Sequence, residues 1–399
     1  VIIVSYNARD YLWQCLFSLR KSLREVDAEV IVFDNHSHDG TVECLQPLFP
    51  EVKFISSNHN LGFARGNNRA VRQSEGQYVL LLNPDTIVAE DTISRALHFM
   101  DGNLRAGSCG VRMMNPCGTD ARESRRGVPT PMTAFFKFTG LCSRFPQNHR
   151  LGRYYMGWLP WGEPGKIETV SGAFFLLRRE ALEAVGLLDE DFFMYGEDID
   201  LSYRLLKDGW ENWYLPLRIL HYKGESTQKS SFRYVHVFYE AMLIFCNKHY
   251  KGIYRSILPL LKAAVNAKAW TALCAVAFRR ARKRMGFIEE NATDSFYVMQ
   301  IRPDHLNRCQ RLAAERGLWA EFHDANALAL GNMSEIMSRR KGAQRAYIVF
   351  DASAFTYKDM FSAMHDYFAD QASMAVYYPE ENKIITECDV ISSSNISVR

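Results

Sequence analysis

An apolar run from Tyr78 to Leu82 stops at Asn83, Pro84 and Asp85. A carboxylate at the end of a buried strand is well placed for a hard divalent cation, because such cations prefer oxygen ligands. Pro84 fixes its own φ angle and biases Asn83 toward an extended conformation, so the Asp85 carboxylate is held in one direction. A cation bound there would neutralise a diphosphate. These residues therefore predict a metal site for a phosphorylated ligand.

His221 is a second candidate ligand for the same cation, provided that its imidazole is neutral. A single histidine is more often structural. Here the sequence Lys-Gly-Glu-Ser-Thr follows one residue later and indicates a loop, where functional residues are more frequent than in a packed core.

Three acidic residues, Glu197, Asp198 and Asp200, begin a helical pattern that continues through Leu201 and Leu205. Acidic residues in a first turn stabilise the helix dipole, which is a purely structural explanation. Three acids within four residues, directly after an aromatic stretch, are more than capping requires.

A loop with three arginines, Arg122, Arg125 and Arg126, precedes this region. It is compatible with a solvated basic loop and equally with a phosphate-binding loop.

Polar residues also follow two other apolar runs. Ser5, Tyr6 and Asn7 follow one run, and Asp34 and Asn35 follow the next. Ligands of α/β sheets bind beyond the carboxyl ends of the strands, so polar residues at three strand ends predict one ligand-binding edge. The alternative is that each residue only forms a turn or caps a helix. That alternative explains one strand end better than three in succession.

The elements that must position these residues alternate between strand and helix. Strands are expected at 1–4, 29–34, 52–57 and 78–83, with helical patterns between them. The strands are continuously apolar, as in a parallel sheet covered on both faces. The sequence therefore predicts an α/β fold. A second, smaller α/β unit is expected from about 294, without a G-x-G-x-x-G motif or a P-loop.

Composition narrows the class of protein. A chain of 399 residues usually forms two or three domains, and a hydrophobic content of 47% suits a packed protein. The net charge of +3 gives no support for nucleic-acid binding. Nine scattered cysteines without a C-x-x-C pair indicate reduced thiols in a cytosolic protein. The chain begins without Met inside a strand-like run, and we expect a few preceding residues to be missing.

Residues 232–285 have a helical pattern. Their apolar part is interrupted by Lys262 and Lys268, too often for a membrane span, and five bases follow within 279–284. The segment 253–285 is compatible with peripheral binding to an anionic membrane, or with an ordinary helix that ends in a solvated basic cluster.

Six motifs, in order, carry a family resemblance: VSYNARDYLWQCLFSL, VFDNHSHDGT, NHNLGFARGNNRAV, LLLNPDTI, SGAFFLLRREALEAVGLLDEDFFMYGEDIDLSYRL and LHYKGEST. Together they resemble the inverting glycosyltransferases of family 2, in particular the rhamnosyltransferase-like branch that builds bacterial surface polysaccharide. The resemblance implies the GT-A fold, a mixed, mostly parallel sheet between helices. The C-terminal unit is similar to the Rossmann-like part of bacterial polyprenyl-phosphate sugar-phosphotransferases. The expected parts are a GT-A domain (1–228), a helical segment (229–290) and an accessory domain (291–399).

The resemblance also implies a role for each matching residue. The donor nucleotide and its sugar would be bound by Tyr6, Asn7, Asp34, Asn35, Asn60, Gly62, Arg65, Asn68, Asn83, Ser171 and Gly172. Asp85 and His221 would bind Mg²⁺ or Mn²⁺. Asp198, paired with Glu197, would be the general base. Asn83 replaces the first Asp of the family's Asp-x-Asp motif.

The implied reaction moves a sugar from a nucleotide-diphosphate donor, such as dTDP-rhamnose or a UDP-hexose, to a hydroxyl of a polysaccharide or lipid-linked acceptor. A cation stabilises the leaving diphosphate and one base takes the proton, so a single displacement inverts the anomeric configuration. A glycoside hydrolase would need two carboxylates that straddle the bond. The remaining alternative is a non-catalytic nucleotide-sugar sensor or scaffold. The expected location is the cytoplasm, at the inner face of the membrane if peripheral.

Overall fold

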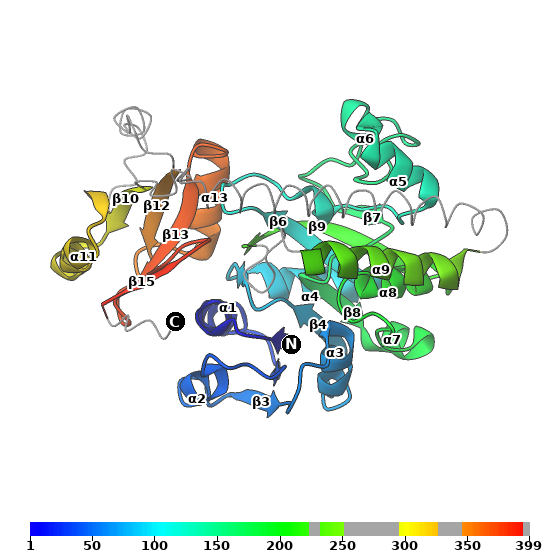
Figure 1. Ribbon diagram of the computed structural model, residues 1–399, viewed down its shortest axis with the longest axis horizontal. Coiled ribbons are helices and arrows are strands. Elements are labelled where there is room, and N and C mark those ends of the chain that lie inside the picture. The colour runs from blue at the N-terminus through cyan, green and yellow to red at the C-terminus, as the bar shows by residue number, and fades with distance from the viewer. Residues whose placement is uncertain (223–231, 251–294, 326–344, 394–399) are drawn as a thin grey trace, which may run out of the picture.

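The structure is a computed structural model that describes residues 1–222, 232–250, 295–325 and 345–393 (Figure 1). The predicted membrane-binding segment 253–285 lies outside these residues, and so do the predicted domain boundaries at 228 and 290. In the described part of the chain, no helix has the length and apolar character needed to cross a membrane.

The first unit is built on a nine-stranded sheet with the order β3-β2-β1-β4-β8-β6-β9-β5, and β7 pairs with β9. Neighbouring strands from β3 to β4 are parallel, whereas β8 is antiparallel to both β4 and β6. The sheet is therefore mixed. The strands are β1 (Ile2–Ser5), β2 (Val30–Asp34), β3 (Val52–Ser56), β4 (Tyr78–Leu82), β5 (Thr86–Val88), β6 (Ala106–Met114), β7 (Gly165–Ile167), β8 (Phe174–Arg178) and β9 (Glu211–His221).

Helices cover both faces of this sheet. Ile3 of β1 packs in one hydrophobic cluster together with α1 and α4, and Ile2 packs in another together with α3, α7 and α8. This alternation explains why the first three residues of β1, Ile2 to Val4, are all apolar. The helices are α1 (Arg9–Ser22), α2 (Thr41–Leu45), α3 (Phe63–Val71), α4 (Thr92–Gly102), α5 (Pro131–Phe138), α6 (Leu141–Arg144), α7 (Arg179–Val185), α8 (Glu197–Lys207) and α9 (Phe232–His249). A short 3₁₀ helix, η1, spans Arg122–Ser124.

The second unit is a six-stranded sheet with the order β11-β10-β12-β13-β14-β15. Its first four strands are parallel and its last two are antiparallel, which confirms the predicted second α/β unit. Its elements are β10 (Ser295–Ile301), α11 (Pro303–Glu315), β11 (Trp319–Asp324), β12 (Arg345–Asp351), α13 (Tyr357–Tyr367), β13 (Ser373–Tyr378), β14 (Lys383–Ile385) and β15 (Val390–Ser392).

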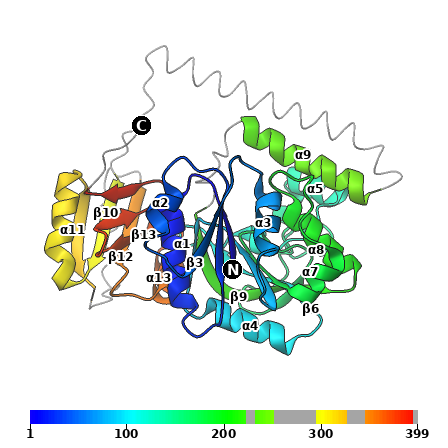
Figure 2. The same ribbon diagram turned by 90° about the horizontal axis from the view of Figure 1, so that it is seen from below.

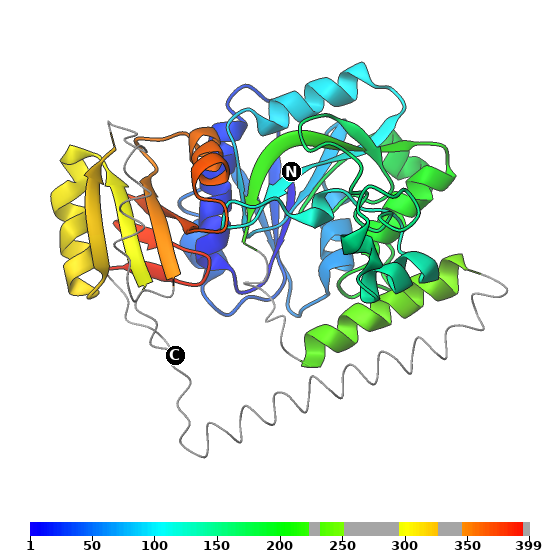
Figure 3. The ribbon, with the colours of Figure 1, turned by 90° about the horizontal axis from the view of Figure 1, so that it is seen from above.

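The two units share one continuous hydrophobic core, and α1 lies between their sheets (Figures 2 and 3). The rings of Trp13 and Tyr378 meet edge to face with centroids 4.7 Å apart. Gln14 Nε2 donates to the Tyr378 hydroxyl at 2.8 Å, and the Tyr357 backbone N–H donates to Glu90 at 2.9 Å. The second unit is therefore packed on the first along α1 rather than held only by a linker.

Candidate active site

The polar residues after β1 and β2 lie side by side, because these strands are parallel neighbours. The backbone N–H of His38 donates to Asn7 Oδ1 at 2.7 Å, and the N–H of Ser37 donates to Asp34 Oδ2 at 3.1 Å. Asp34 Oδ1 is buried and has no hydrogen-bond partner among the described residues. Tyr6 is partly exposed at the same edge. One oxygen of the Asp34 carboxylate is therefore unpaired within the described residues, as the predicted contact of Asp34 with a ligand would require.

Asn35, Asn60 and Gly62 shape the loop that leads into α3. Asn35 Nδ2 donates to Asn60 Oδ1 at 3.0 Å, and Asn60 Oδ1 also accepts from the Gly62 N–H at 2.9 Å. Gly62 has a φ of 82°, and a Cβ there would lie 2.5 Å from the carbonyl oxygen of Phe193. Only glycine fits at this position. These contacts are structural, and the predicted ligand contacts of the three residues stay predictions.

Asn68 is turned toward the protein interior. Its Nδ2 donates to the Leu188 carbonyl at 2.8 Å, and its Oδ1 accepts from the Leu188 N–H at 3.1 Å. The amide therefore clamps the 188–190 segment to α3. Arg65, one turn earlier, is exposed and lies 3.6 Å from Glu190. For Asn68 the described contacts support a structural role more than the predicted donor contact.

Asp85 and His221 meet at the end of the sheet. Because β5 and β9 are antiparallel and pair Thr86 with His221, the imidazole is brought to the end of β4. His221 Nε2 lies 3.3 Å from Asp85 Oδ1 and 3.3 Å from Asn83 Nδ2. Asp85 is only 4% exposed, and His221 Nδ1 is buried without a hydrogen-bond partner among the described residues.

This donor set fits a divalent cation that also binds the ligand's phosphates. Magnesium ions in such sites take one or two protein ligands and complete their shell with water and phosphate oxygens. Within the described ranges, no group of three or more His, Cys, Asp or Glu side chains could hold a metal ion. Among the described residues, a cation there would be held by Asp85 and His221, and phosphate oxygens of the ligand would complete its coordination.

Asp198 lies in the first turn of α8, directly after Gly196 and Glu197. Its Oδ2 accepts from Arg126 Nη2 at 2.8 Å and from the Gly172 N–H at 3.1 Å. Its Oδ1 accepts from the backbone N–H of Ile199 at 2.8 Å. These donors fix the direction of the carboxylate, which is the geometry that a positioned base requires.

Glu197 is buried beside Asp198. Burial raises the pKa of Glu197 to about 8, and the charge of Asp198 acts in the same direction. Its Oε2 has no hydrogen-bond partner in the part of the chain that the structure describes. The two neighbouring carboxyl groups therefore carry less negative charge at neutral pH than two ionised carboxylates would.

The structure brings the metal-ligand candidates and Asp198 to the same edge. Leu82 pairs with Phe174 in the sheet, so Asn83 lies beside Ala173. The Asn83 N–H donates to the Ala173 carbonyl at 3.1 Å, and the next residue toward the N-terminus, Gly172, binds Asp198. Ser171 belongs to the same turn. A continuous series of contacts thus connects His221 with Arg126.

The three arginines of the arginine loop have different surroundings, which the sequence did not predict. Arg126 reaches Asp198, whereas Arg125 is buried with its guanidinium 3.5 Å from the centroid of the Trp161 ring. Arg122 is exposed. The solvated-loop interpretation is therefore wrong for two of the three arginines. Sequence reasoning could not assign Arg126 to Asp198, because 72 residues separate them.

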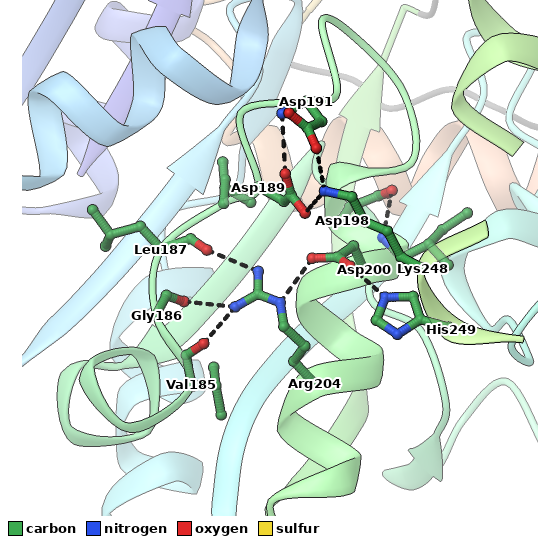
Figure 4. Close-up of polar contacts among 12 residues, drawn as sticks. Val185, Gly186, Leu187, Asp189, Asp191, Asp198, Asp200, Arg204, Lys248 and His249 are labelled. Carbon is green, nitrogen blue, oxygen red and sulfur yellow. Dashed lines mark hydrogen bonds and ion pairs between the residues drawn. The ribbon is translucent and has the colours of Figure 1, made fainter. Parts of the chain in front are cut away.

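Asp200, the third acid of the cluster, has a structural role (Figure 4). It is 1% exposed and accepts from Arg204 Nε at 2.7 Å and from His249 Nε2 at 2.6 Å. Arg204 in turn binds the carbonyls of Val185, Gly186 and Leu187 at the end of α7. The spacing of Asp200 and Arg204, four residues apart on a helix, is a signal that the sequence offered.

Lys248, at the end of α9, pairs with Asp189 and Asp191 in the loop that precedes α8 (Figure 4). Phe192 from this loop packs with Ala241 and Phe245 of α9. Helix α9 therefore fixes the loop from which Glu197 and Asp198 emerge.

The fold and the site together define a class. A mixed α/β sheet covered by helices on both faces agrees with the GT-A fold that the motifs imply, and ligands of such sheets bind beyond the strand ends where these polar side chains lie. Residues 1–186 match the model of the family "Glycosyl transferase family 2". The N-terminal part of the chain is therefore a family 2 glycosyltransferase domain, and the predicted family and enzyme class are confirmed.

Two curated proteins to which the chain is similar are named as a rhamnosyltransferase and a hexosyltransferase. The chain is 28% identical over 298 residues to the N-acetylglucosaminyl-diphospho-decaprenol L-rhamnosyltransferase of Mycobacterium tuberculosis, a match that covers 71% of this chain and 95% of the relative. It is 27% identical over 213 residues to the low-salt glycan biosynthesis hexosyltransferase Agl10 of Haloferax volcanii, covering 52% of this chain and 61% of the relative.

Solved structures with some similarity include two glycosyltransferases. The mannosyltransferase PcManGT from Pyrobaculum calidifontis, in complex with GDP-Man and Mn²⁺, is 16% identical with a TM-score of 0.42, covering 72% of this chain and 80% of that chain. TarS from Staphylococcus aureus, in complex with UDP-GlcNAc, is 18% identical with a TM-score of 0.40, covering 63% and 67%.

Proposed function

We propose that this protein is an inverting transferase that moves a rhamnosyl or hexosyl group from a nucleoside-diphosphate sugar to a hydroxyl of a lipid-linked or polysaccharide acceptor. The observation that supports the proposal is the series of contacts that leads from His221 through Asn83 and the 171–173 turn to Asp198. The activity in the name of the Mycobacterium tuberculosis relative supports a dTDP-rhamnose-like donor and a lipid-diphosphate acceptor. UDP-hexoses are the second donor class.

At the donor end, the residues bind and orient the nucleotide sugar. Asp34 offers its unpaired Oδ1 to the nucleoside, next to Tyr6 and Asn7. Asp85 and His221 would hold a divalent cation, which supplies neutralisation of the leaving diphosphate when bound. Asn83 lies against His221 and orients the imidazole. Ser171 and Gly172 border the space between this end and Asp198.

At the acceptor end, Asp198 takes the proton. As the acceptor oxygen forms its bond to the anomeric carbon, the bond from that carbon to the diphosphate oxygen breaks and the hydroxyl proton moves to the Asp198 carboxylate. No protein nucleophile takes part in this displacement, so the configuration inverts. Arg126 and the Gly172 N–H orient the carboxylate during this step.

Donor turnover tests this function. The purified protein is incubated with dTDP-rhamnose or a UDP-hexose, with Mg²⁺ or Mn²⁺, and release of nucleoside diphosphate is followed with and without a chelator. We expect slow release with one donor that the chelator abolishes and added cation restores. The alternative function, a nucleotide-sugar sensor or scaffold, needs no base and predicts donor binding without any release. Release that is equal with and without chelator would contradict the role of the cation.

We place the reaction at the cytoplasmic face of the membrane, where a lipid-linked acceptor would be presented. The experiment for this part is fractionation of cells that produce the protein, followed by detection in the membrane and soluble fractions.

A further inference from the structure

The part of the chain between residues 124 and 162 contains no Asp or Glu, although the whole chain is nearly neutral with 48 basic and 45 acidic residues. The basic residues in this stretch are Arg125, Arg126, Lys137, Arg144, Arg150 and Arg153. Helices α5 and α6 and the turn after them, residues 131–150, form the protruding part of this stretch. We name these residues the α5–α6 hairpin.

The α5–α6 hairpin exposes large apolar side chains. Met132, Phe135 and Phe145 are 50%, 55% and 46% exposed. Among the described residues, nine large apolar side chains are exposed, and three of them fall within this short segment. Met132 and Phe135 are three residues apart on α5, so they lie on the same side of the helix.

The basic residues divide into two groups. Arg125 and Arg126 point into the protein, toward Trp161 and Asp198, and Lys137 binds the hydroxyl of Tyr154 at 2.8 Å. Arg144 and Arg150 are exposed, and neither forms an ion pair with any residue that the structure describes.

Arg153 is the exception among the exposed bases, because it pairs with Glu168 at 2.6 Å. The hairpin surface therefore combines exposed apolar side chains with two exposed cations that have no described counter-ion.

We infer that the α5–α6 hairpin is the surface by which this protein binds an anionic lipid bilayer. Aromatic and aliphatic side chains enter the boundary between head groups and acyl chains, while arginines beside them contact anionic head groups. Charge complementarity selects this occupant, since the hairpin carries no carboxylate that would repel an anionic surface.

The position of the hairpin agrees with this inference. It projects at the edge of the first unit, away from the second sheet (Figure 1). The residues at its foot, 126–130, carry Arg126 to Asp198. A bilayer bound to the hairpin would therefore hold a lipid-linked hydroxyl near the proposed base, and this last step rests on the proposed function.

Vesicle co-sedimentation with the full chain tests the inference. Vesicles of phosphatidylcholine, with and without phosphatidylglycerol, are compared for the wild type and for two double variants, Met132→Ser/Phe135→Ser and Arg144→Gln/Arg150→Gln. We expect binding to the anionic vesicles alone. The arginine variant should bind about thirty-fold more weakly, the loss expected for two cations at an anionic surface. The apolar variant should also lose most of its binding.

Matched controls replace exposed residues of the same kinds elsewhere. Leu48→Ser/Leu104→Ser and Arg24→Gln/Arg69→Gln change exposed side chains outside the hairpin and should bind like the wild type. If both hairpin variants bound anionic vesicles as tightly as the wild type does, the membrane contact would belong to another part of the chain. That result would overturn the inference. The inference also fails if the wild type does not bind anionic vesicles, or if the hairpin variants abolish self-association in sedimentation velocity instead.

Donor turnover separates this inference from the proposed function. Because release of nucleoside diphosphate from a soluble donor requires no membrane, both hairpin variants should keep it. If the protein bound vesicles but released no nucleoside diphosphate from any donor, the inferred membrane-binding surface would stand and the proposed enzyme activity would be refuted.

Discussion

Asp198 receives hydrogen bonds on both carboxylate oxygens, from Arg126 and Gly172 on one and from Ile199 on the other. Ile199 is the next residue in the chain, whereas Arg126 and Gly172 are 72 and 26 residues away, so the proposed base depends on two contacts that are distant in sequence. The strand-end residues Asp34 and Asp85 could be predicted, because the position of a carboxylate after an apolar run is a local pattern. The partner of Asp198 could not be predicted, because no local pattern connects residue 126 with residue 198.

At the residue scale, Asp198→Asn should lower kcat about 10²–10⁴-fold, the usual contribution of a positioned base. The amide keeps the shape of the side chain but cannot accept the proton, so the affinity for the donor should stay near the wild-type value. Steady-state transfer and donor titration measure the two effects separately. Asp208→Asn, at the exposed end of the same helix, is the matched control and should leave both unchanged. Full turnover in Asp198→Asn would show that another group is the base.

Glu197 should make stability depend on pH. Burial, and second the charge of Asp198, raise the pKa of Glu197 from 4.5 to about 8. Between these values the unfolded chain has released a proton that the folded chain still holds, so rising pH favours unfolding. The free energy of unfolding should decrease across this window, by at most about 1.4 kcal/mol per pH unit from this group.

Glu197→Gln stays neutral and should remove this contribution, so its stability relative to the wild type should increase with pH. Denaturant unfolding of both proteins at several pH values within the window measures the difference. Glu183→Gln, an exposed glutamate on α7, should keep the wild-type pH dependence. Parallel pH profiles for wild type and Glu197→Gln would contradict the raised pKa.

At the scale of elements, the alternation of strands and helices was predictable, since apolar runs and helical stripes are local. The antiparallel insertion of β8 between β4 and β6 was not, because pairing partners depend on the whole sheet. Asp200 and Arg204 join α8 to the end of α7 and to α9, and we call these contacts the clamp. The spacing of Asp200 and Arg204 within α8 was visible in the sequence, but their partners in α7 and α9 could not be predicted from it.

Asp200→Ala should destabilise the protein by about 3–5 kcal/mol, because removing one partner leaves the charge of Arg204 without its buried carboxylate. The loss should appear as a lower midpoint in denaturant unfolding. Asp208→Ala removes an exposed carboxylate from the same helix and should change stability by less than about 0.5 kcal/mol. If the two variants were equally stable, the clamp would have no energetic role.

At the scale of the whole molecule, the sequence predicted two α/β units but not the core that they share. Leu12, Leu16 and Leu19 recur at helical spacing in α1, and they pack in the core with strands of the first sheet. Trp13 and Gln14 contact Tyr378 of the second unit instead, and Tyr378 is 364 residues from Gln14 in the chain. No periodicity within α1 could identify that partner.

Tyr378→Ala should destabilise both units together by about 3–5 kcal/mol, the usual cost of removing a buried aromatic ring. Tyr378 is 2% exposed and contacts Trp13, Gln14 and Tyr357. The midpoint of unfolding should be lower than in the wild type, and it should be the same whether it is monitored by tryptophan fluorescence or by far-ultraviolet circular dichroism. Tyr367→Ala, on an exposed part of α13, is the matched control. Separate transitions for the two probes would indicate that the units unfold independently.

The position of α1 between two sheets also sets a limit on shortened versions of the enzyme. A protein truncated after the first unit would expose an apolar surface that includes the side chains of Trp13 and Phe17. An exposed apolar surface of this kind promotes aggregation. A shortened protein for crystallisation or biocatalysis should therefore keep the second unit, which begins at Ser295, or first have the side chains of that apolar surface replaced by charged ones.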